Sequence, residues 1–150
     1  MKFRFLWIGK TKNKNWRALQ EEYLQRLSHF AKFEVVEIKE SQSHENKEIE
    51  GKRILEAIPS GAFVILLDVI GKQFGSEELA KEIEGWQNRS VREIIFVIGG
   101  QDGVSAEVEE KSDLRLSLSK MTLTHEAARV LLAEQLYRSF TIINNYPYQK

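Results

Sequence analysis

The chain of 150 residues contains no cysteine and no long run of apolar residues. The absence of cysteine excludes disulfide bonds, thiolate metal sites and cysteine nucleophiles, and it suits the reducing cytoplasm. No apolar segment approaches the roughly 18 residues that a membrane span requires. Residues 1–4 precede neither an apolar core nor a small-residue cleavage site, so we expect no signal peptide. We expect one cytoplasmic domain over residues 1–150, because domains commonly have about 100–200 residues.

The sequence also lacks a net charge, since 22 Lys and Arg residues balance 22 Asp and Glu residues. The charges are unevenly distributed along the chain. Residues 1–30 contain seven basic and two acidic residues (+5), and residues 31–110 contain nine basic and seventeen acidic residues (−8). Residues 111–150 contain six basic and three acidic residues (+3). Either the two chain ends form a basic surface, or the charges are unevenly spread by chance. Because phosphate neutralisation drives non-specific binding to nucleic acids, a neutral protein needs a local basic patch for such a partner.

Strand-like and helix-like apolar spacing alternate along the chain. The runs 62–67 (AFVILL) and 94–98 (IIFVI) are typical of central strands covered on both faces. The predicted strands span residues 2–8, 33–38, 62–67, 94–98 and 114–118. The predicted helices span residues 16–30, 54–58, 76–86, 105–111 and 124–142, with Ser76 and Thr124 as caps and with 41–50 as a loop or frayed helix start. This alternation predicts an α/β fold with a mainly parallel sheet flanked by helices.

Three segments follow predicted strands at the sheet edge where ligands gather in open α/β folds. They are Leu67-Asp68 running into residues 69–72, the glycine-rich residues 98–103, and residues 116–123. Glycines directly after a buried strand let a ligand approach the backbone closely. A plain strand-to-helix turn has the same Gly-Gly-x-x-Gly pattern, so this pattern alone leaves both a ligand site and a turn open.

Several common sites find no support in the sequence. Residues 99–103 do not match the dinucleotide fingerprint, and there is no Walker motif. His29, His44 and His125 lack metal-ligand spacing, so no metal site is predicted. Ser119 has no evident histidine and carboxylate partners, so a hydrolase triad is unsupported.

Residues 119–123 (SKMTL) form a mixed polar and apolar loop before a long helix. Met121 and Leu123 either clasp a flat base or are ordinary core residues, and the spacing leaves both open. The helix that follows is apolar on more than one face, so it is either wholly buried or shared with a partner subunit. Arg138 is a surface charge by default, but beside the aromatic tail it is a candidate phosphate or base contact.

Three stretches together resemble the RlmH family: residues 97–103 (VIGGQDG), 116–125 (LSLSKMTLTH) and 129–138 (RVLLAEQLYR). The resemblance covers the whole chain, including the strand that ends in Gly9-Lys10. Members of this family are SPOUT-class methyltransferases that act on a pseudouridine of 23S ribosomal RNA in the assembled ribosome. The resemblance implies an α/β fold with a deep C-terminal trefoil knot, a homodimer, and S-adenosylmethionine bound in the knot.

The resemblance also implies roles for individual residues. The implied reaction is methyl transfer to N3 of a pseudouridine, with Arg138 and Tyr148 as RNA contacts and His125 in proton handling. By motif match, the implied S-adenosylmethionine-binding residues are Leu67, Gly99, Leu118, Ser119, Lys120, Met121, Thr122 and Leu123. The candidates for a basic patch that contacts the ribosome are Lys10, Lys12, Lys14, Arg17 and the C-terminal arginines.

The C-terminal tail departs from the family pattern. The family commonly ends in His-Pro-Tyr-His-Arg, whereas this chain has Tyr146 and Gln149 at the two histidine positions. Glutamine cannot act as a general base near neutral pH, so the proton acceptor is left open. Two alternatives therefore stand beside the main interpretation. One is a cofactor-binding or ribosome-binding family member with lost or altered activity, and the other is a methyltransferase for another RNA such as tRNA.

Overall fold

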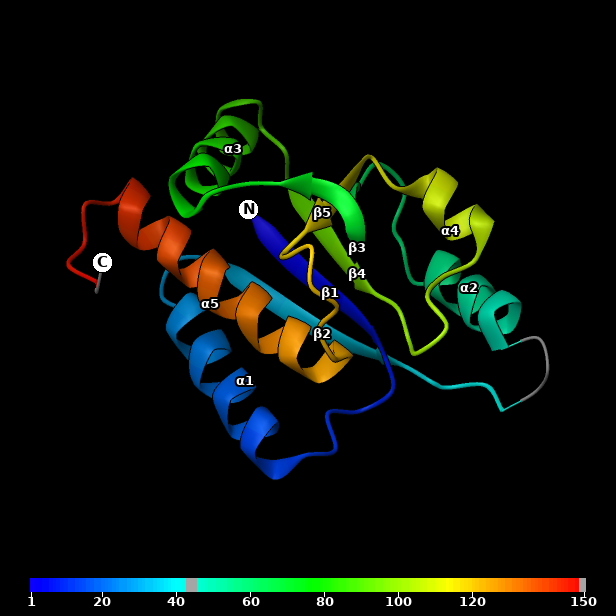
Figure 1. The fold of residues 1–150 in the computed structure, drawn as a ribbon. Coiled ribbons are helices and arrows are strands. Elements are labelled where there is room, and N and C mark those ends of the chain that lie inside the picture. Colours follow the sequence, from blue (N-terminus) through cyan, green and yellow to red (C-terminus); the bar gives the residue numbers. More distant parts are fainter. Residues whose placement is uncertain (43–45, 149–150) are drawn as a thin grey trace.

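In a computed structural model of the protein, the described residues are 1–42 and 46–148, where five strands alternate with five helices (Figure 1). His44 and Gln149 lie outside these residues. The strands are β1 (Lys2–Ile8), β2 (Lys32–Ile38), β3 (Phe63–Gln73), β4 (Glu93–Ile98) and β5 (Leu114–Ser117). The helices are α1 (Lys14–Leu27), α2 (Asn46–Glu56), α3 (Ser76–Asn88), α4 (Ala106–Lys111) and α5 (His125–Ile143). The predicted alternation is thus confirmed. Within the described part of the chain, none of the helices combines the length and apolar character needed to cross a bilayer.

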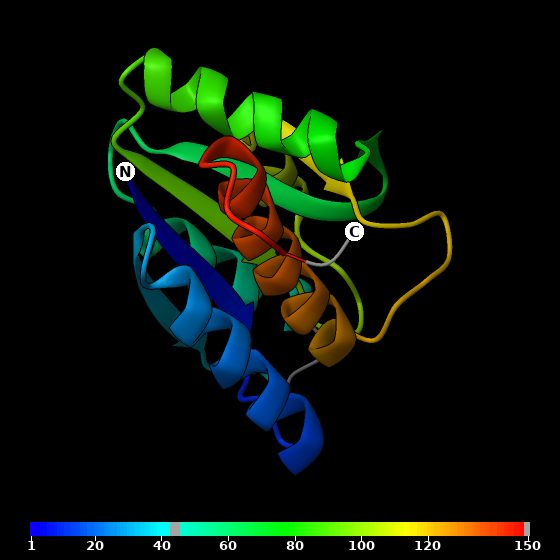
Figure 2. The ribbon, with the colours of Figure 1, turned by 90° about the vertical axis from the view of Figure 1, so that its left-hand side faces the viewer.

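All five strands lie parallel in one sheet with the order β2-β1-β4-β3-β5. The helices α1, α3 and α5 cover one face, and α2 and α4 cover the other (Figures 1 and 2). Strand β1 explains why two layers are needed. Its residues Phe3, Phe5 and Trp7 pack toward α1, α3 and α5, while Leu6 and Ile8 pack toward α2 and α4. A strand that is apolar on both sides must be covered on both faces.

Strand β3 is longer than the sequence suggested. We predicted a strand over residues 62–67 followed by a loop, but β3 continues to Gln73. Its pairing with β5 shifts register between Leu67 and Lys72. A Cβ on Gly71 would lie 2.7 Å from the carbonyl carbon and oxygen of Arg115, so the absence of a side chain there permits the close approach of the two strands. Apolar periodicity ends at Leu67 and gives no signal for this extension.

Two local predictions at element ends are wrong. Gly75, not Ser76, precedes the first turn of α3, and the Glu78 carboxylate accepts a hydrogen bond from the Gly75 N–H at 2.6 Å. The Ser76 hydroxyl instead donates to Oε1 of Gln135 on α5 at 2.8 Å. Strand β5 ends at Ser117, so Leu118 belongs to the loop that follows. By contrast, Thr124 caps α5 as predicted, accepting from the N–H of Ala127 at 3.2 Å.

Helix α5 lies between α1 and α3 on one face of the sheet (Figure 2). Its residues Leu132, Ala133, Leu136 and Phe140 belong to the core. The sequence left open whether this helix is buried within its own chain or shared with a partner subunit. Burial within the chain covers most of its apolar surface. Leu131 and Ile142 remain exposed, at 43% and 38%.

Candidate functional site

A cleft of about 590 Å³ opens at the carboxyl ends of β4 and β5, beside the part of β3 where its register with β5 shifts. Its walls come from residues 66–69 within β3, residues 98–104 at and after the end of β4, and the segment from Leu116 to Ala128. The three segments singled out in the sequence therefore meet at one place, because their strands are neighbours in a parallel sheet. The cleft-lining residues that the resemblance had pointed to are Leu67, Gly99, Leu118, Ser119, Met121, Thr122, Leu123 and His125. Lys120 is exposed and does not line the cleft.

The loop over residues 118–124 has an internal frame of side-chain hydrogen bonds. The Ser117 hydroxyl donates to the Ser119 carbonyl at 2.9 Å, and the Met121 N–H donates to the Ser119 hydroxyl oxygen at 3.0 Å. None of the hydrogen bonds among the described residues uses the peptide groups of Lys120, Thr122 or Leu123. Donors and acceptors of the backbone are thus available to a polar ligand beside apolar side chains.

Met121 is 77% exposed although it lines the cleft. The sequence left open whether this residue belongs to the core or clasps a ligand, and its exposure excludes the core. A thioether side chain at the mouth of a cleft adapts its shape to a flat ring at low cost.

The turn over residues 99–104 is tightly folded on itself. The Gly103 N–H donates to the Gly100 carbonyl at 3.1 Å, and Gly103 has a φ of +79°, in the region that favours glycine. A Cβ on Gly99 would lie 2.8 Å from Cγ1 of Val104 and 3.0 Å from the backbone of Gly103. Gly99 is therefore required by the turn itself, which forms one wall of the cleft.

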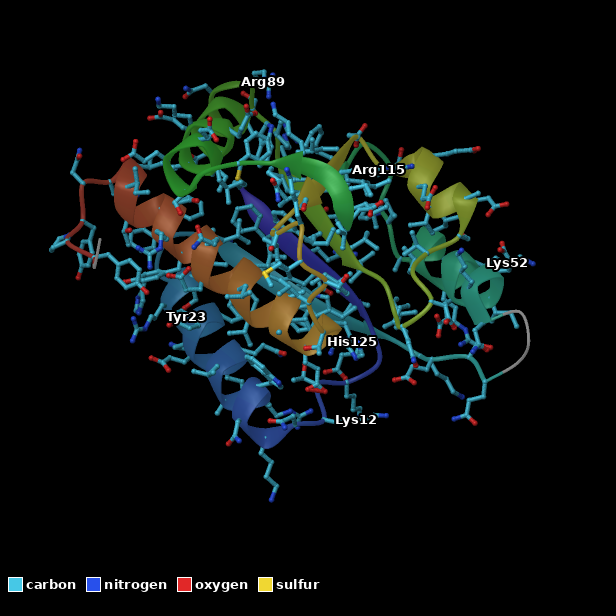
Figure 3. The ribbon with its side chains drawn as sticks, viewed as in Figure 1. Lys12, Tyr23, Lys52, Arg89, Arg115 and His125 are labelled. Atoms are coloured by element: carbon cyan, nitrogen blue, oxygen red, sulfur yellow. The ribbon has the colours of Figure 1, made fainter. Side chains whose placement is uncertain are left out.

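His125 stands where the cleft adjoins a second, smaller cavity of about 300 Å³. Both cavities are lined by His125 and by the turn from Gly100 to Asp102, and the smaller one also by Lys10 and Lys12 of the loop after β1. Figure 3 shows Lys12 near His125 at the start of α5. The basic loop thus lies next to the cleft. Among the described residues, no group of three or more histidines and carboxylates is placed to hold a metal ion.

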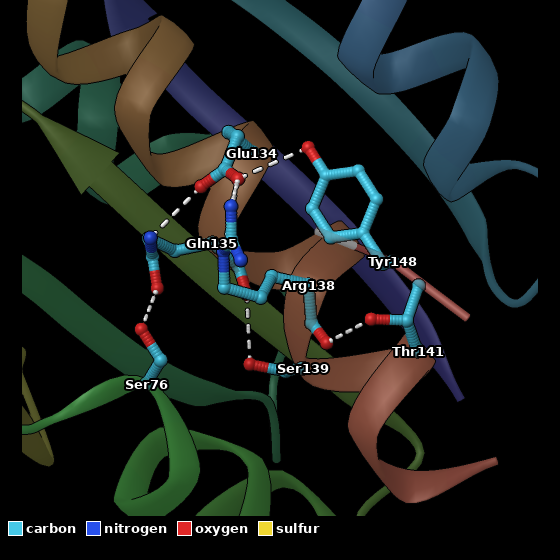
Figure 4. Close-up of polar contacts among 7 residues, drawn as sticks. All are labelled: Ser76, Glu134, Gln135, Arg138, Ser139, Thr141 and Tyr148. Carbon is cyan, nitrogen blue, oxygen red and sulfur yellow. Dashed lines mark hydrogen bonds and ion pairs between the residues drawn. The ribbon is translucent and has the colours of Figure 1, made fainter. Parts of the chain in front are cut away.

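Arg138 and Tyr148 lie elsewhere, in a cluster around Glu134 (Figure 4). The Arg138 guanidinium forms an ion pair with Glu134, and the pairing raises the pKa of Arg138. The Tyr148 hydroxyl donates to Oε1 of Glu134 at 3.2 Å, and the Arg138 guanidinium lies 4.6 Å from the Tyr148 ring centroid. Gln135 joins through a 2.8 Å bond to the other Glu134 oxygen. The tail is therefore folded back against α5.

The cluster and the cleft lie at different places along α5. His125 begins the helix, and Arg138 comes thirteen residues later, which corresponds to about 20 Å at a rise of 1.5 Å per residue. One copy of the chain does not bring Arg138 and Tyr148 to its own cleft. Sequence reasoning missed Glu134 as their shared partner, although its spacing of four residues from Arg138 on a helix was a usable signal.

Burial and the nearby Glu134 carboxylate raise the pKa of Tyr148 to about 12, from an ordinary value of 10. The neutral phenol therefore stabilises the docked tail below pH 10, and this contribution is lost as the pH rises through about 12. At neutral pH Tyr148 is a hydrogen-bond donor and not a base. In alkaline titration of tyrosinate absorbance, the Tyr148→Phe variant is expected to lack a step near pH 12. Tyr146→Phe, which removes the hydroxyl of a 58% exposed ring, is the control, and loss of the same late step there would contradict the assignment.

Comparison with known proteins gives consistent matches over the full chain. A family model described as "Predicted SPOUT methyltransferase" matches residues 1–149. A protein of Christiangramia forsetii called "Ribosomal RNA large subunit methyltransferase H" is 42% identical, over 99% of this chain and 98% of its own length. Proteins of the same name from Desulfotalea psychrophila (42%) and Streptococcus pneumoniae (40%) match over 100% of both chains. A solved structure, a probable methylase family protein of Haemophilus influenzae, shares the fold at a TM-score of 0.59 and 15% identity, covering 99% of this chain and 70% of that one.

Proposed function

The chain belongs to the SPOUT methyltransferase family, among the large-subunit ribosomal RNA methyltransferases H, and from this membership we propose that it methylates 23S ribosomal RNA with S-adenosylmethionine as the donor. The observation that supports this most directly is the cleft at the ends of β4 and β5, where the β3 segment around Leu67 and the turns around Gly99 and Met121 converge. The proposed acceptor is N3 of a pseudouridine in the assembled ribosome. A ribosomal substrate places the reaction in the cytoplasm.

The residues of the cleft fit S-adenosylmethionine. Leu67 and Leu118, which are partly exposed in the cleft, offer apolar surface to an adenine ring, and the unused peptide groups of Thr122 and Leu123 can bond its polar edge. When bound, the donor supplies a sulfonium methyl group that leaves for a nucleophilic nitrogen while the sulfur becomes a neutral thioether. The contribution of the chain is to orient the reactants and exclude water. The ring nitrogen must lose its proton, and His125, at the junction of the two cavities, is our candidate for handling it.

We further propose that the active form is a homodimer in which Arg138 and Tyr148 of one copy serve the cleft of the other. Two observations support this. Neither side chain lines the cleft of its own chain, and Arg138 follows Ala128, the last cleft-lining residue of α5, by ten residues, or about 15 Å of helix. Leu131 and Ile142 on the same helix leave apolar surface exposed, which a second copy would cover. The trefoil knot of the SPOUT class, enclosing residues 118–124, is part of the same proposal and rests on family membership.

The proposed function is tested by incubating ribosomes with labelled S-adenosylmethionine. Label in the 23S RNA supports it, and mass spectrometry of ribosomal RNA from cells lacking the protein should then show one missing methyl group on a pseudouridine. Cofactor binding without transfer would instead indicate a family member with lost activity. Label in added tRNA would indicate a different RNA substrate.

Truncating Met121 to alanine is expected to lower the affinity for S-adenosylmethionine about fivefold. The change removes apolar contact at the mouth of the cleft, which corresponds to about 1 kcal/mol for a partly buried side chain. Isothermal titration calorimetry measures the affinity. Ile70→Ala is the matched control, because Ile70 is 79% exposed and does not line the cleft. Equal losses in both variants would show that Met121 does not contact the cofactor.

A further inference from the structure

Arg129 is a fully buried cation on α5, with 0% of its surface exposed. Its guanidinium donates to the Ile8 carbonyl at 2.7 Å and to the Thr11 hydroxyl at 2.9 Å, and it lies 5.0 Å from the ring centroid of Trp7. Among the described residues no carboxylate lies within ion-pair distance, and its Nε has no hydrogen-bond partner. Burying a charge without a paired carboxylate costs folding free energy. An apolar side chain at this position would therefore stabilise the core more than Arg129 does.

Glu126 lies one helical turn before Arg129 and contacts the same loop. One oxygen of its carboxylate accepts from the Lys12 N–H at 2.9 Å, and the other accepts from the Asn13 N–H at 3.3 Å. The two side chains together bind the backbone or side chains of four positions between Ile8 and Asn13. Within this loop only the side chains of Lys10 and Lys12 carry charge. The helix thus fixes the path of a loop whose charges are both positive.

The held loop borders the site. Lys10 and Lys12 line the smaller cavity together with His125, the first residue of α5. The same helix begins directly after the loop over residues 118–124, which forms a wall of the larger cleft. The attachment of residues 8–13 to α5 therefore fixes the backbone that carries two cations beside the cleft, where the Lys12 Nζ lies 3.8 Å from Glu40 Oε1. Without this attachment, residues 9–13 have no apolar side chain to hold them in place.

We propose that Arg129 is a positioning residue for RNA binding, which together with Glu126 holds Lys10 and Lys12 where they contact RNA phosphates beside the cofactor cleft. This inference rests on the proposed function, because it takes ribosomal RNA as the partner. Phosphate contacts by lysine supply affinity that depends on salt and not on base sequence. Arg129 acts on RNA only through the loop, since its own side chain is enclosed by the protein.

The test compares Arg129→Lys with wild type by co-sedimentation with purified ribosomes over a range of salt concentrations. Lysine keeps the charge but cannot reach the Ile8 carbonyl and the Thr11 hydroxyl with a planar fork. We expect ribosome affinity to fall about tenfold and the salt slope to decrease by about 1 to 2, as for the loss of one or two phosphate contacts. Affinity for S-adenosylmethionine, measured by calorimetry, is expected to stay at the wild-type value.

Two further variants separate positioning from general destabilisation. Leu132→Ala truncates a buried core residue of α5 that does not contact the loop, and it should lower thermal stability without changing the salt slope. In a Lys10→Ala/Lys12→Ala background, Arg129→Lys should add no further loss of ribosome affinity, because the groups it positions are gone. Additive losses, or a wild-type salt slope in Arg129→Lys, would overturn the inference. Failure of wild type to label ribosomal RNA would instead refute the proposed function, since co-sedimentation does not require turnover.

Discussion

The Gly99→Val variant is expected to lose at least about a hundredfold in affinity for S-adenosylmethionine. A Cβ at this position lies 2.8 Å from Val104 Cγ1 and 3.0 Å from the backbone of Gly103, and valine adds two methyl groups beyond that. Backbone cannot move aside cheaply, so the turn over residues 99–104 must open. This turn is a wall of the cleft, and its displacement of even about 1 Å is enough to remove well-placed contacts. From the sequence alone we would have assigned the effect to space that the ligand occupies, whereas the structure assigns the clash to the turn.

Calorimetry measures the loss, and a thermal melt shows whether the variant is folded. Gly85→Val is the matched control. Gly85 lies in α3, and a Cβ there meets no atom within 4 Å. It should bind the cofactor like wild type and gain slightly in stability, because valine has a higher helix propensity than glycine. Wild-type affinity in folded Gly99→Val would contradict the placement of the cofactor against this turn.

Arg138→Ala is expected to lower methyl transfer to ribosomal RNA more than a hundredfold while leaving S-adenosylmethionine affinity unchanged. The guanidinium is the cation of the Glu134 cluster, and its loss removes an RNA contact and the group on which the Tyr148 ring is stacked. Cofactor affinity is spared because Arg138 does not line the cleft of its own chain and lies about 15 Å along α5 from Ala128, the last cleft-lining residue of that helix. Transfer of label from S-adenosylmethionine to ribosomes measures the first quantity and calorimetry the second. Arg89→Ala, which removes an exposed arginine on another helix end, is the control.

The same variant tests the dimer when it is mixed with Gly99→Val. Arg138→Ala retains an intact cleft, and Gly99→Val retains an intact Glu134 cluster. If one copy serves the other, mixed dimers contain one complete composite site, and co-expression should restore part of the lost transfer. No recovery in verified mixed dimers would show that each copy uses its own Arg138, in conflict with the separation along α5.

The sequence was informative wherever a property is local. The runs at 62–67 and 94–98 are apolar on both sides, which identified central strands, and the segments after them were correctly placed at one edge of the sheet. Thr124 was recognisable as a cap, because its hydroxyl bonds a neighbouring N–H three residues on. These features depend on residues close together in the chain, so spacing and residue type are sufficient.

The features that the sequence did not reveal depend on distant partners. Strand β3 continues past Leu67 because Gly71 lets it approach β5, more than forty residues later, and no periodicity records that pairing. The resemblance gave roles to both Arg138 and His125, but residue matches carry no information on how far apart the two side chains lie along the helix. Arg129 received no predicted role, since its partners Ile8 and Thr11 are more than a hundred positions away.

Helix α5 joins three regions of the molecule: the cleft at His125, the held basic loop at Arg129 and Glu126, and the Glu134 cluster. It runs through 19 residues without glycine or proline, so it offers no point at which to bend. Each inserted or deleted residue would shift everything beyond it by about 1.5 Å and turn it by about 100°. We therefore expect relatives to vary in chain length outside this helix, in loops such as 57–62, and to keep the number of residues between the counterparts of His125 and Arg138 constant.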